Sequence, residues 1–251
     1  MVQGVQILCP DPDLPVPPNV LSWMTRTPFC SLVGSLNYLA IATRPDIAFV
    51  IGHLATVFDC YRPEHWDAAI CVVRYLKGTR LFYLELSGSN PIRPIAFTDS
   101  DYANCPDTSQ SVGSYCFSLA SGMVSWASHR QRHTADSSCY AEYIAIHDAT
   151  HEVLFFRQFL DGLDMPVLGP TPLYCDNDAA HQLTEDQHWH LKIKHFWVCY
   201  HTTRDLVNLD ELKIFHIRSS KNVADILTKP LGPSDFTCLR SYLGIRSSRS
   251  A

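Results

Sequence analysis

The sequence has few charged residues and no surplus of positive charge. Charged side chains make up 18% of its 251 residues, hydrophobic ones make up 46%, and the formal net charge is −5. This composition is typical of a globular protein with a core of its own and unlike that of a disordered chain. Proteins that bind nucleic acid tightly on their own often have a basic surplus, so the acidic balance argues mildly against that class, but it leaves room for a local basic groove.

Signals for a membrane, for secretion and for a cysteine framework are also lacking. The sequence has no apolar run of about 18 residues, the length that a membrane span requires. Its start, MVQGVQILCPDPDLPVPP, has no basic residue ahead of an apolar run and is a poor signal peptide. The ten cysteines form no Cys-x-x-Cys pair. We therefore expect free thiols in a reducing compartment, no membrane partner, and a protein that is not secreted.

The pattern of apolar residues divides the chain into four segments. Residues 1–20 are rich in proline and predict a disordered lead. Residues 21–90 have helical spacing, interrupted at Arg44-Pro45. Residues 91–232 mix strand and helix patterns and predict an α/β domain, and residues 233–251 are left as a C-terminal tail.

Within the third segment, a hairpin and a long helix are the clearest elements. The hairpin spans residues 112–129 and turns near Ser121-Gly122. The helix follows it, with Asp136 as the expected N-cap and Gly162 at its end. Its expected apolar face contains Ala145, Ala149, Val153 and Phe156. The stretch around residues 179–183 predicts the start of another helix, and residues 222–231 predict a final one.

Four carboxylates lie at the ends of predicted elements. Asp99 ends a strand, Glu142 lies early in the long helix, Asp176 ends the next strand, and Asp225 opens the last helix. Side chains at such positions can converge on one edge of a sheet, where four carboxylates would repel one another without a cation. Mg²⁺ and Mn²⁺ prefer oxygen ligands, and two such ions ~4 Å apart can support phosphodiester cleavage.

Each carboxylate taken alone has a simpler interpretation. An aspartate at a strand end is usually a turn or cap residue, and Asp136 and Asp148 are better read as a cap and a solvated helix face. The sequence blocks around the four positions support the metal-binding interpretation over this simpler one. These blocks are SLVGSLNYLAIATRPDIAFVIGHLA, RPEHWDAAICVVRYLKGT, FTDSDYAN, SVGSYCFSLASGMVSWASHRQ, SSCYAEYIA, YCDNDAAHQL, IKHFWVCYH and NVADILTKPL.

In this order the blocks resemble the C-terminal part of a copia-type retrotransposon Pol polyprotein, where the end of the reverse transcriptase precedes a ribonuclease H domain. The resemblance runs from about residue 28 to about residue 245. It implies an RNase H-like fold, α/β with a mixed five-stranded sheet and flanking helices, after a small helical thumb- or connection-like region. It also implies cleavage of the RNA strand of RNA–DNA hybrids in a cytoplasmic virus-like particle or in the nucleus.

The resemblance also assigns roles to residues. Asp99, Glu142, Asp176 and Asp225 match the catalytic, metal-binding carboxylates. Two Mg²⁺ or Mn²⁺ ions are implied, with Asp99 on both, Glu142 and Asp176 on one, and Asp225 on the other. Asp101 and His216 are auxiliary candidates, and a surface role for His216 is an equally good interpretation.

Candidate contacts to the hybrid lie in loops and in a basic, histidine-rich stretch. They are Asn177, Ser137, Ser138, Arg130, Arg132, Lys192 and Lys194. Contacts to phosphates position a duplex, and contacts to the 2′-hydroxyl distinguish RNA from DNA. A solvated turn is an equally good interpretation of the loop around Arg130, and a zinc site built from residues 181–201 is the less favoured alternative because the spacing is loose.

The sequence departs from the family pattern in several places. It contains no Asp-Asp pair, which is the polymerase signature, so DNA synthesis would require a polymerase portion that this chain does not contain. Asp136, Tyr140, Asp178 and Trp197 stand where the family usually has other residue types. The main alternative is therefore a degenerate, non-catalytic remnant that binds nucleic acid or protein. An integrase-like phosphotransferase fits the pattern around Asp225 less well.

Overall fold

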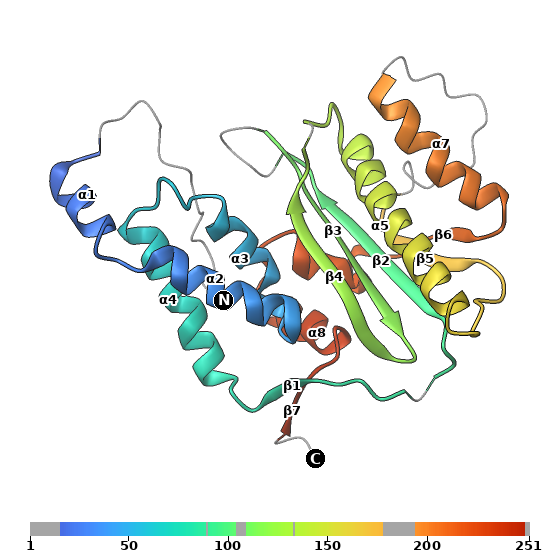
Figure 1. Cartoon of the computed structure of the whole chain (residues 1–251), viewed down its shortest axis with the longest axis horizontal. Coiled ribbons are helices and arrows are strands. Elements are labelled where there is room, and N and C mark those ends of the chain that lie inside the picture. Colours follow the sequence, from blue (N-terminus) through green and yellow to red (C-terminus); the bar gives the residue numbers. More distant parts are fainter. Residues whose placement is uncertain (1–15, 89, 104–108, 133, 178–193, 249–251) are drawn as a thin grey trace.

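The computed structural model describes residues 16–88, 90–103, 109–132, 134–177 and 194–248, except for the side chains of residues 194–200. A central sheet has helices on both of its faces (Figure 1). Within these ranges no helix is both long enough and apolar enough to cross a membrane.

The N-terminal region is helical, as the sequence predicts. Its elements are α1 (Pro18–Met24), α2 (Phe29–Ala42), η1 (Pro45–Ile47), α3 (Ala48–Ala55) and α4 (Pro63–Gly78). The break expected at Arg44-Pro45 is present, because Pro45 begins a separate 3-10 turn. Residues 18–20, expected in the disordered lead, instead open α1.

The α/β region contains the expected mixed five-stranded sheet. Its strands are β2 (Pro94–Asp101), β3 (Val112–Leu119), β4 (Gly122–Arg130), β5 (Thr171–Cys175) and β6 (Leu212–His216), in the order β4-β3-β2-β5-β6. The pairs β2–β3 and β3–β4 are antiparallel, whereas β2–β5 and β5–β6 are parallel. Ala120 and Ser121 form the hairpin turn with φ of 49° and 72°, as a tight turn between twisted strands requires.

The long helix α5 (Ser138–Asp161) covers one face of the sheet. Its expected apolar face is buried, and its C-cap is Gly162, as expected. The expected N-cap is wrong: Ser137 caps the helix, because its hydroxyl accepts a hydrogen bond from the Tyr140 amide at 3.2 Å. Helix α7 (Lys194–Asn208) packs on α5, and the helix expected near residues 179–183 lies outside the described residues.

The C-terminal segment lies on the opposite face of the sheet, against the N-terminal helices (Figure 1). It comprises η2 (Ser219–Lys221), η3 (Val223–Leu227), α8 (Pro233–Tyr242) and β7 (Ile245–Ser247). The final helix expected over 222–231 is thus only the short 3-10 turn η3. Residues 233–247, expected within a tail, form α8 and β7, and β7 pairs antiparallel with β1 (Phe82–Leu84).

A shared core joins the C-terminal segment to the rest of the chain. Leu227, Phe236 and Leu243 are buried in one cluster with Cys116 of the sheet, and Tyr75 of α4 packs against it. The indole nitrogen of a β4 residue, Trp126, also donates to the carbonyl of Ala40 in α2 at 2.8 Å. Burial of this apolar surface is why the segment folds back instead of remaining a tail.

Candidate acidic metal centre

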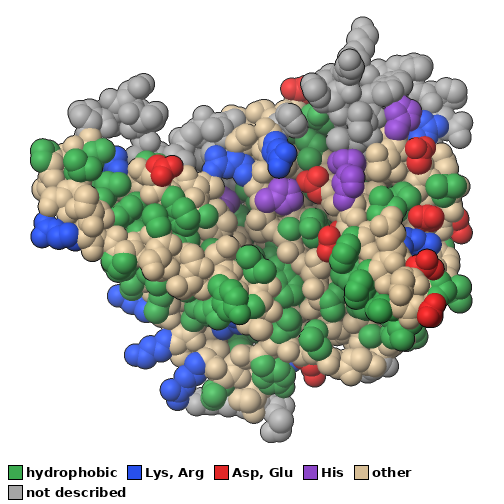
Figure 2. Space-filling model, viewed as in Figure 1, with side chains coloured by type: hydrophobic (Ala, Val, Ile, Leu, Met, Phe, Trp, Pro, Cys, Tyr) green, Lys and Arg blue, Asp and Glu red, His purple; other side chains and the backbone are tan. Residues whose placement is uncertain are grey.

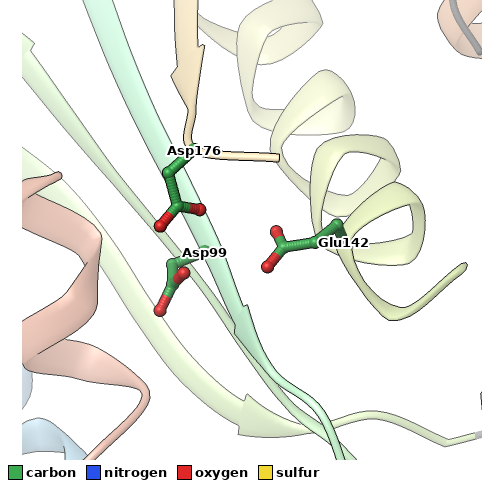
Figure 3. Close-up of side chains that lie close together, drawn as sticks. All are labelled: Asp99, Glu142 and Asp176. Carbon is green, nitrogen blue, oxygen red and sulfur yellow. The ribbon is translucent and has the colours of Figure 1, made fainter. Parts of the chain in front are cut away.

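Three of the four predicted carboxylates converge at one edge of the sheet. Asp99, Glu142 and Asp176 each offer an oxygen atom, and these atoms all lie within 4.8 Å of one another. Figure 3 shows Asp99 on one strand, Asp176 just past the end of the neighbouring strand, and Glu142 reaching toward them from the helix. Asp99 is 2% exposed and Glu142 is 6% exposed, whereas Asp176 is half-buried, so the group is open to solvent on the Asp176 side only. We call these three residues the carboxylate triad.

Local sequence and topology together place the triad. Asp99 does not end its strand as predicted, because β2 continues for two more residues. Because β2 and β5 are parallel neighbours, Asp99 near the C-terminal end of β2 and Asp176 directly after β5 still reach the same edge of the sheet. Helix α5 packs across β2 and begins at this edge, which directs Glu142 toward Asp99. The backbone amide of Ser100 donates to Glu142 Oε1 at 3.2 Å and fixes the orientation of this carboxylate.

Asp225 lies beside the triad on η3, which is tied to the sheet by buried polar side chains. The Asn222 side chain donates to the carbonyl of Thr98 at 2.9 Å and caps η3 through the amide of Ala224. The hydroxyl of Ser114 donates to the carbonyl of Ala224 at 3.1 Å. These bonds hold Asp225, which is 5% exposed, against the end of β2.

Two residues that follow Asp225 contact the carboxylates directly. The hydroxyl of Thr228 donates to the Asp99 carboxylate. The ammonium of Lys229 lies 3.0 Å from Asp225 Oδ2 and 3.8 Å from Asp99 Oδ2. Lys229 therefore bridges the triad and Asp225.

The proximity and burial of these acids change their protonation. Burial, then the charges of Asp99 and Asp176, raise the pKa of Glu142 to about 9. Burial, then the charge of Asp99, raise the pKa of Asp225 to about 7. Burial also raises the pKa of Asp99, against the opposing effects of Lys229 and Thr228. Bound protons thus relieve the part of the repulsion between these acids that the ammonium of Lys229 does not offset.

The oxygen atoms of the site fit a hard divalent cation. Among the described residues, the buried atoms Glu142 Oε2 and Asp225 Oδ1 have no hydrogen-bond partner. A buried carboxylate oxygen without a donor is costly, and a cation coordinated by oxygen atoms removes that cost. Carboxylate oxygens are the preferred ligands of Mg²⁺ and Mn²⁺, so the residues present suit the ions that the sequence predicts.

Several other predicted site residues lie at the same edge of the sheet. Asp101 ends β2 and pairs with Val112, which in turn pairs with Arg130 at the end of β4. Ser137 and Ser138 lie exposed at the start of α5. Figure 2 shows Lys, Arg and His side chains gathered near the upper edge of the molecule, where β2 and β4 end in Figure 1.

The remaining candidates are more scattered. Asn177 directly follows Asp176 and is half-buried, and Arg132 is exposed just beyond β4. His216 is exposed at the end of β6. Lys192 and most of the histidine-rich stretch lie outside the described residues, as does the side chain of Lys194.

Four residues that shape the site are not among those that the sequence predicts: Asn222, Thr228, Lys229 and Gln131. Asn222 had a usable signal, because an asparagine directly before a helical turn is a common N-cap. Gln131 is buried, and its amide donates to the carbonyl of Ala141 at 2.8 Å, which ties β4 to the start of α5. The contacts of Thr228 and Lys229 with Asp99 join positions far apart in the chain and have no local signal.

Comparison with known proteins identifies relatives along nearly the whole chain. The Pol polyprotein from transposon TNT 1-94 of Nicotiana tabacum is 35% identical over 225 residues, 90% of this chain and 17% of the polyprotein. The Pol polyprotein from transposon RE1 of Arabidopsis thaliana is 32% identical over 219 residues, 87% of this chain and 15% of the polyprotein. The chain therefore spans less than a fifth of the length of these relatives. No family model matches it.

Among solved structures, RNase H1 of Halobacterium salinarum is similar to 54% of this chain. The alignment covers 94% of that protein with a TM-score of 0.40 and 18% identity. The mixed five-stranded sheet with flanking helices is the RNase H-like fold that the sequence predicts. The homologues of this chain are thus retrovirus-related Pol polyproteins from copia-type transposons, at 32–35% identity along about 90% of its length, as the sequence blocks predict.

Proposed function

We propose that this chain is a metal-dependent ribonuclease H that hydrolyses the RNA strand of RNA–DNA hybrids. The observation that carries the proposal is the carboxylate triad. Its oxygen atoms converge within 4.8 Å, and Asp225 beside it has a buried oxygen without a partner. Four acids gathered at one sheet edge are difficult to explain as caps or turns, because their mutual repulsion destabilises the chain unless a cation binds.

The four carboxylates would divide between two Mg²⁺ or Mn²⁺ ions. Asp99 belongs to the triad and also shares the ammonium of Lys229 with Asp225, so it would help to hold both ions. When bound, such ions supply activation of a water molecule and stabilisation of the leaving oxygen. The described protein residues contribute orientation: Ser100, Thr228 and the η3 contacts hold the carboxylates before substrate arrives.

The RNA–DNA hybrid would lie across the sheet edge that bears the triad. Arg130, Ser137 and Ser138 lie at this edge, and Asn177 is adjacent to Asp176. Contacts of this kind to phosphates would position the duplex, and contacts to the 2′-hydroxyl would select the RNA strand. Arg132, Lys192 and Lys194 remain proposed phosphate contacts, and Asp101 and His216 remain proposed auxiliary groups.

The proposal extends to the context of the chain. Residues 21–90 would be the thumb- or connection-like end of a reverse transcriptase, and a polymerase portion of the polyprotein would be a partner. We expect no DNA synthesis from this chain alone, since it has no Asp-Asp pair. The proposed place of action is a cytoplasmic virus-like particle or the nucleus.

Cleavage of a labelled RNA–DNA hybrid in Mg²⁺ or Mn²⁺ tests the proposal. Asp176→Asn preserves the side-chain volume but removes a charge from the triad, and it should lower the rate by about a hundredfold, as for loss of one electrostatic contact in an active site. The matched control is Asp148→Asn, because Asp148 is an aspartate that pairs with His129 at 2.9 Å instead of joining the triad. It should retain the native rate.

A non-catalytic domain that binds nucleic acid is the competing function. The departures from the family pattern at residues 136, 140, 178 and 197 favour it. A native chain with native circular dichroism that binds the hybrid but does not cut it would support this alternative and refute the proposed hydrolysis. Equal rates for the native chain and Asp176→Asn would point to a contaminating nuclease.

A further inference from the structure

Lys229 occupies a position that the proposed function assigns to a cation. Its ammonium lies 3.0 Å from Asp225 Oδ2 and 3.8 Å from Asp99 Oδ2. Asp99 also offers an oxygen atom to the triad, within 4.8 Å of those of Glu142 and Asp176. The ion pairs of Lys229 thus involve Asp99 and Asp225, and not the other two acids.

Geometry indicates that this ammonium is held as a counter-ion. The backbone amide of Lys229 donates to the carbonyl of Asp225 at 3.3 Å, a turn that brings the side chain back to the Asp225 carboxylate. The ammonium lies within ion-pair distance of both acids, so it offsets part of the repulsion between them.

The lysine also has a route away from the carboxylates. Its side chain is 33% exposed, whereas the side chains of Asp99 and Asp225 are 2% and 8% exposed. Withdrawal of Lys229 would therefore return an ammonium to water without moving η3, which its own buried hydrogen bonds hold against the sheet. The two acids would stay in place and become available to another cation.

We propose that Lys229 is a built-in counter-ion that a divalent cation must displace from Asp99 and Asp225, so that the two cation positions fill unequally. This inference rests on the proposed metal site. The position on the triad, where no described lysine or arginine forms an ion pair with Glu142 or Asp176, would fill first. The position between Asp99 and Asp225 would fill second and more weakly.

Titration of the metal-free chain with Mn²⁺ tests this order without using activity. Calorimetry at one fixed pH for every variant, so that metal binding displaces the same proton from Glu142 in each, should resolve one tighter and one weaker site in the native chain. Lys229→Met keeps the length of the aliphatic stem and removes the charge. It should lower the dissociation constant of the weaker site for Mn²⁺ by about tenfold, because the lost ion pair is intermediate between an exposed and a buried one. The dissociation constant of the tighter site should change less.

Matched variants separate this role from a purely structural ion pair. Lys221→Met removes an exposed lysine from η2 in the same segment and should leave both sites unchanged. Lys229→Arg retains the charge and should retain a weak second site. Asp225→Asn should abolish the second site in the native background and in Lys229→Met alike. Circular dichroism confirms that each variant is folded before it is titrated.

The outcomes distinguish this inference from the proposed function. If Lys229→Met binds Mn²⁺ at both sites as the native chain does, or more weakly, Lys229 is not a displaced counter-ion, even if the native chain cuts the hybrid. If the second site tightens but the native chain cuts no hybrid, the inference stands and only the proposed hydrolysis fails. A native chain that binds no Mn²⁺ overturns both.

Discussion

Replacing Glu142 by glutamine should stabilise the metal-free chain and weaken the metal-bound one. Glu142 is 6% exposed and lies within 4.8 Å of two other carboxylates. Glutamine has nearly the same shape but no charge, and its amide can donate to the neighbouring carboxylates. The substitution therefore removes the cost of burying an acid, charged or protonated, beside two other carboxylates, and it also removes a ligand for the proposed cation.

The size of the effect follows from the pKa of Glu142, which rises from 4.5 to about 9 on folding. Above pH 4.5 the folded chain keeps a proton that the unfolded chain releases, so stability falls as the pH rises toward 9. Glutamine does not titrate and avoids this loss. At 1.4 kcal/mol per pH unit, the interval from 4.5 to neutrality corresponds to about 3 kcal/mol in favour of the variant.

Urea denaturation followed by circular dichroism measures the difference. In a chelating buffer the two proteins should have similar stability near about pH 4.5, and the advantage of Glu142→Gln should grow toward neutrality. With Mn²⁺ at about a hundred times its dissociation constant, the native chain should gain about 2.7 kcal/mol. The variant should gain much less, because it lacks the Glu142 ligand.

Glu152→Gln is the matched control, because Glu152 lies on the same helix and accepts a hydrogen bond from Ser125 at 2.6 Å, away from the triad. It should show neither the pH-dependent gain nor the loss of metal stabilisation. A Glu142→Gln protein that is less stable than the native chain by a constant amount at every pH would refute the electrostatic reasoning.

Two further substitutions test how the fold supports the site. Asn222→Ala removes the bond to the Thr98 carbonyl and the cap of η3, so it should cost about 2 kcal/mol and weaken Mn²⁺ binding in calorimetry. Asn208→Ala, at an exposed position in α7, is its control; equal Mn²⁺ affinity in both would show that η3 needs no such anchor. Leu243→Ala, at a fully buried position, should cost about 3 kcal/mol in urea denaturation. The control Leu209→Ala, at an exposed position, should change the free energy of unfolding little. An equally small loss of stability for Leu243→Ala would mean that residues 233–247 are a dispensable tail.

The local elements of the fold could be predicted well because their signals lie within short stretches. The hairpin around Ser121 follows from two β-rich runs joined at Ser121-Gly122, and the buried face of α5 follows from the helical spacing of its apolar residues. Asp136 was the wrong cap because neighbouring residues Asp136 and Ser137 are both good N-caps, and only the backbone of the folded chain selects one.

The acidic positions of the candidate site could also be predicted, since strands that end in aspartate are visible in the sequence. Their convergence depended on which strands are neighbours, and the resemblance to the copia-type polyproteins supplied that topology. The return of residues 233–247 to β1 and to the N-terminal helices was not predicted, because strand pairing between positions over a hundred residues apart has no local signal.

The sequence by itself thus determined the four carboxylates, most of the elements that carry them, and the resemblance to the copia-type Pol polyproteins. Only the tertiary structure decided which groups touch them. Thr228 reaches Asp99 across 129 positions and Asn222 reaches Thr98 across 124. Lys229 lies between Asp99 and Asp225 because the packing of η3 on the sheet brings it there. Such contacts arise from burial of the whole chain, so they exist only once the distant segments have packed together.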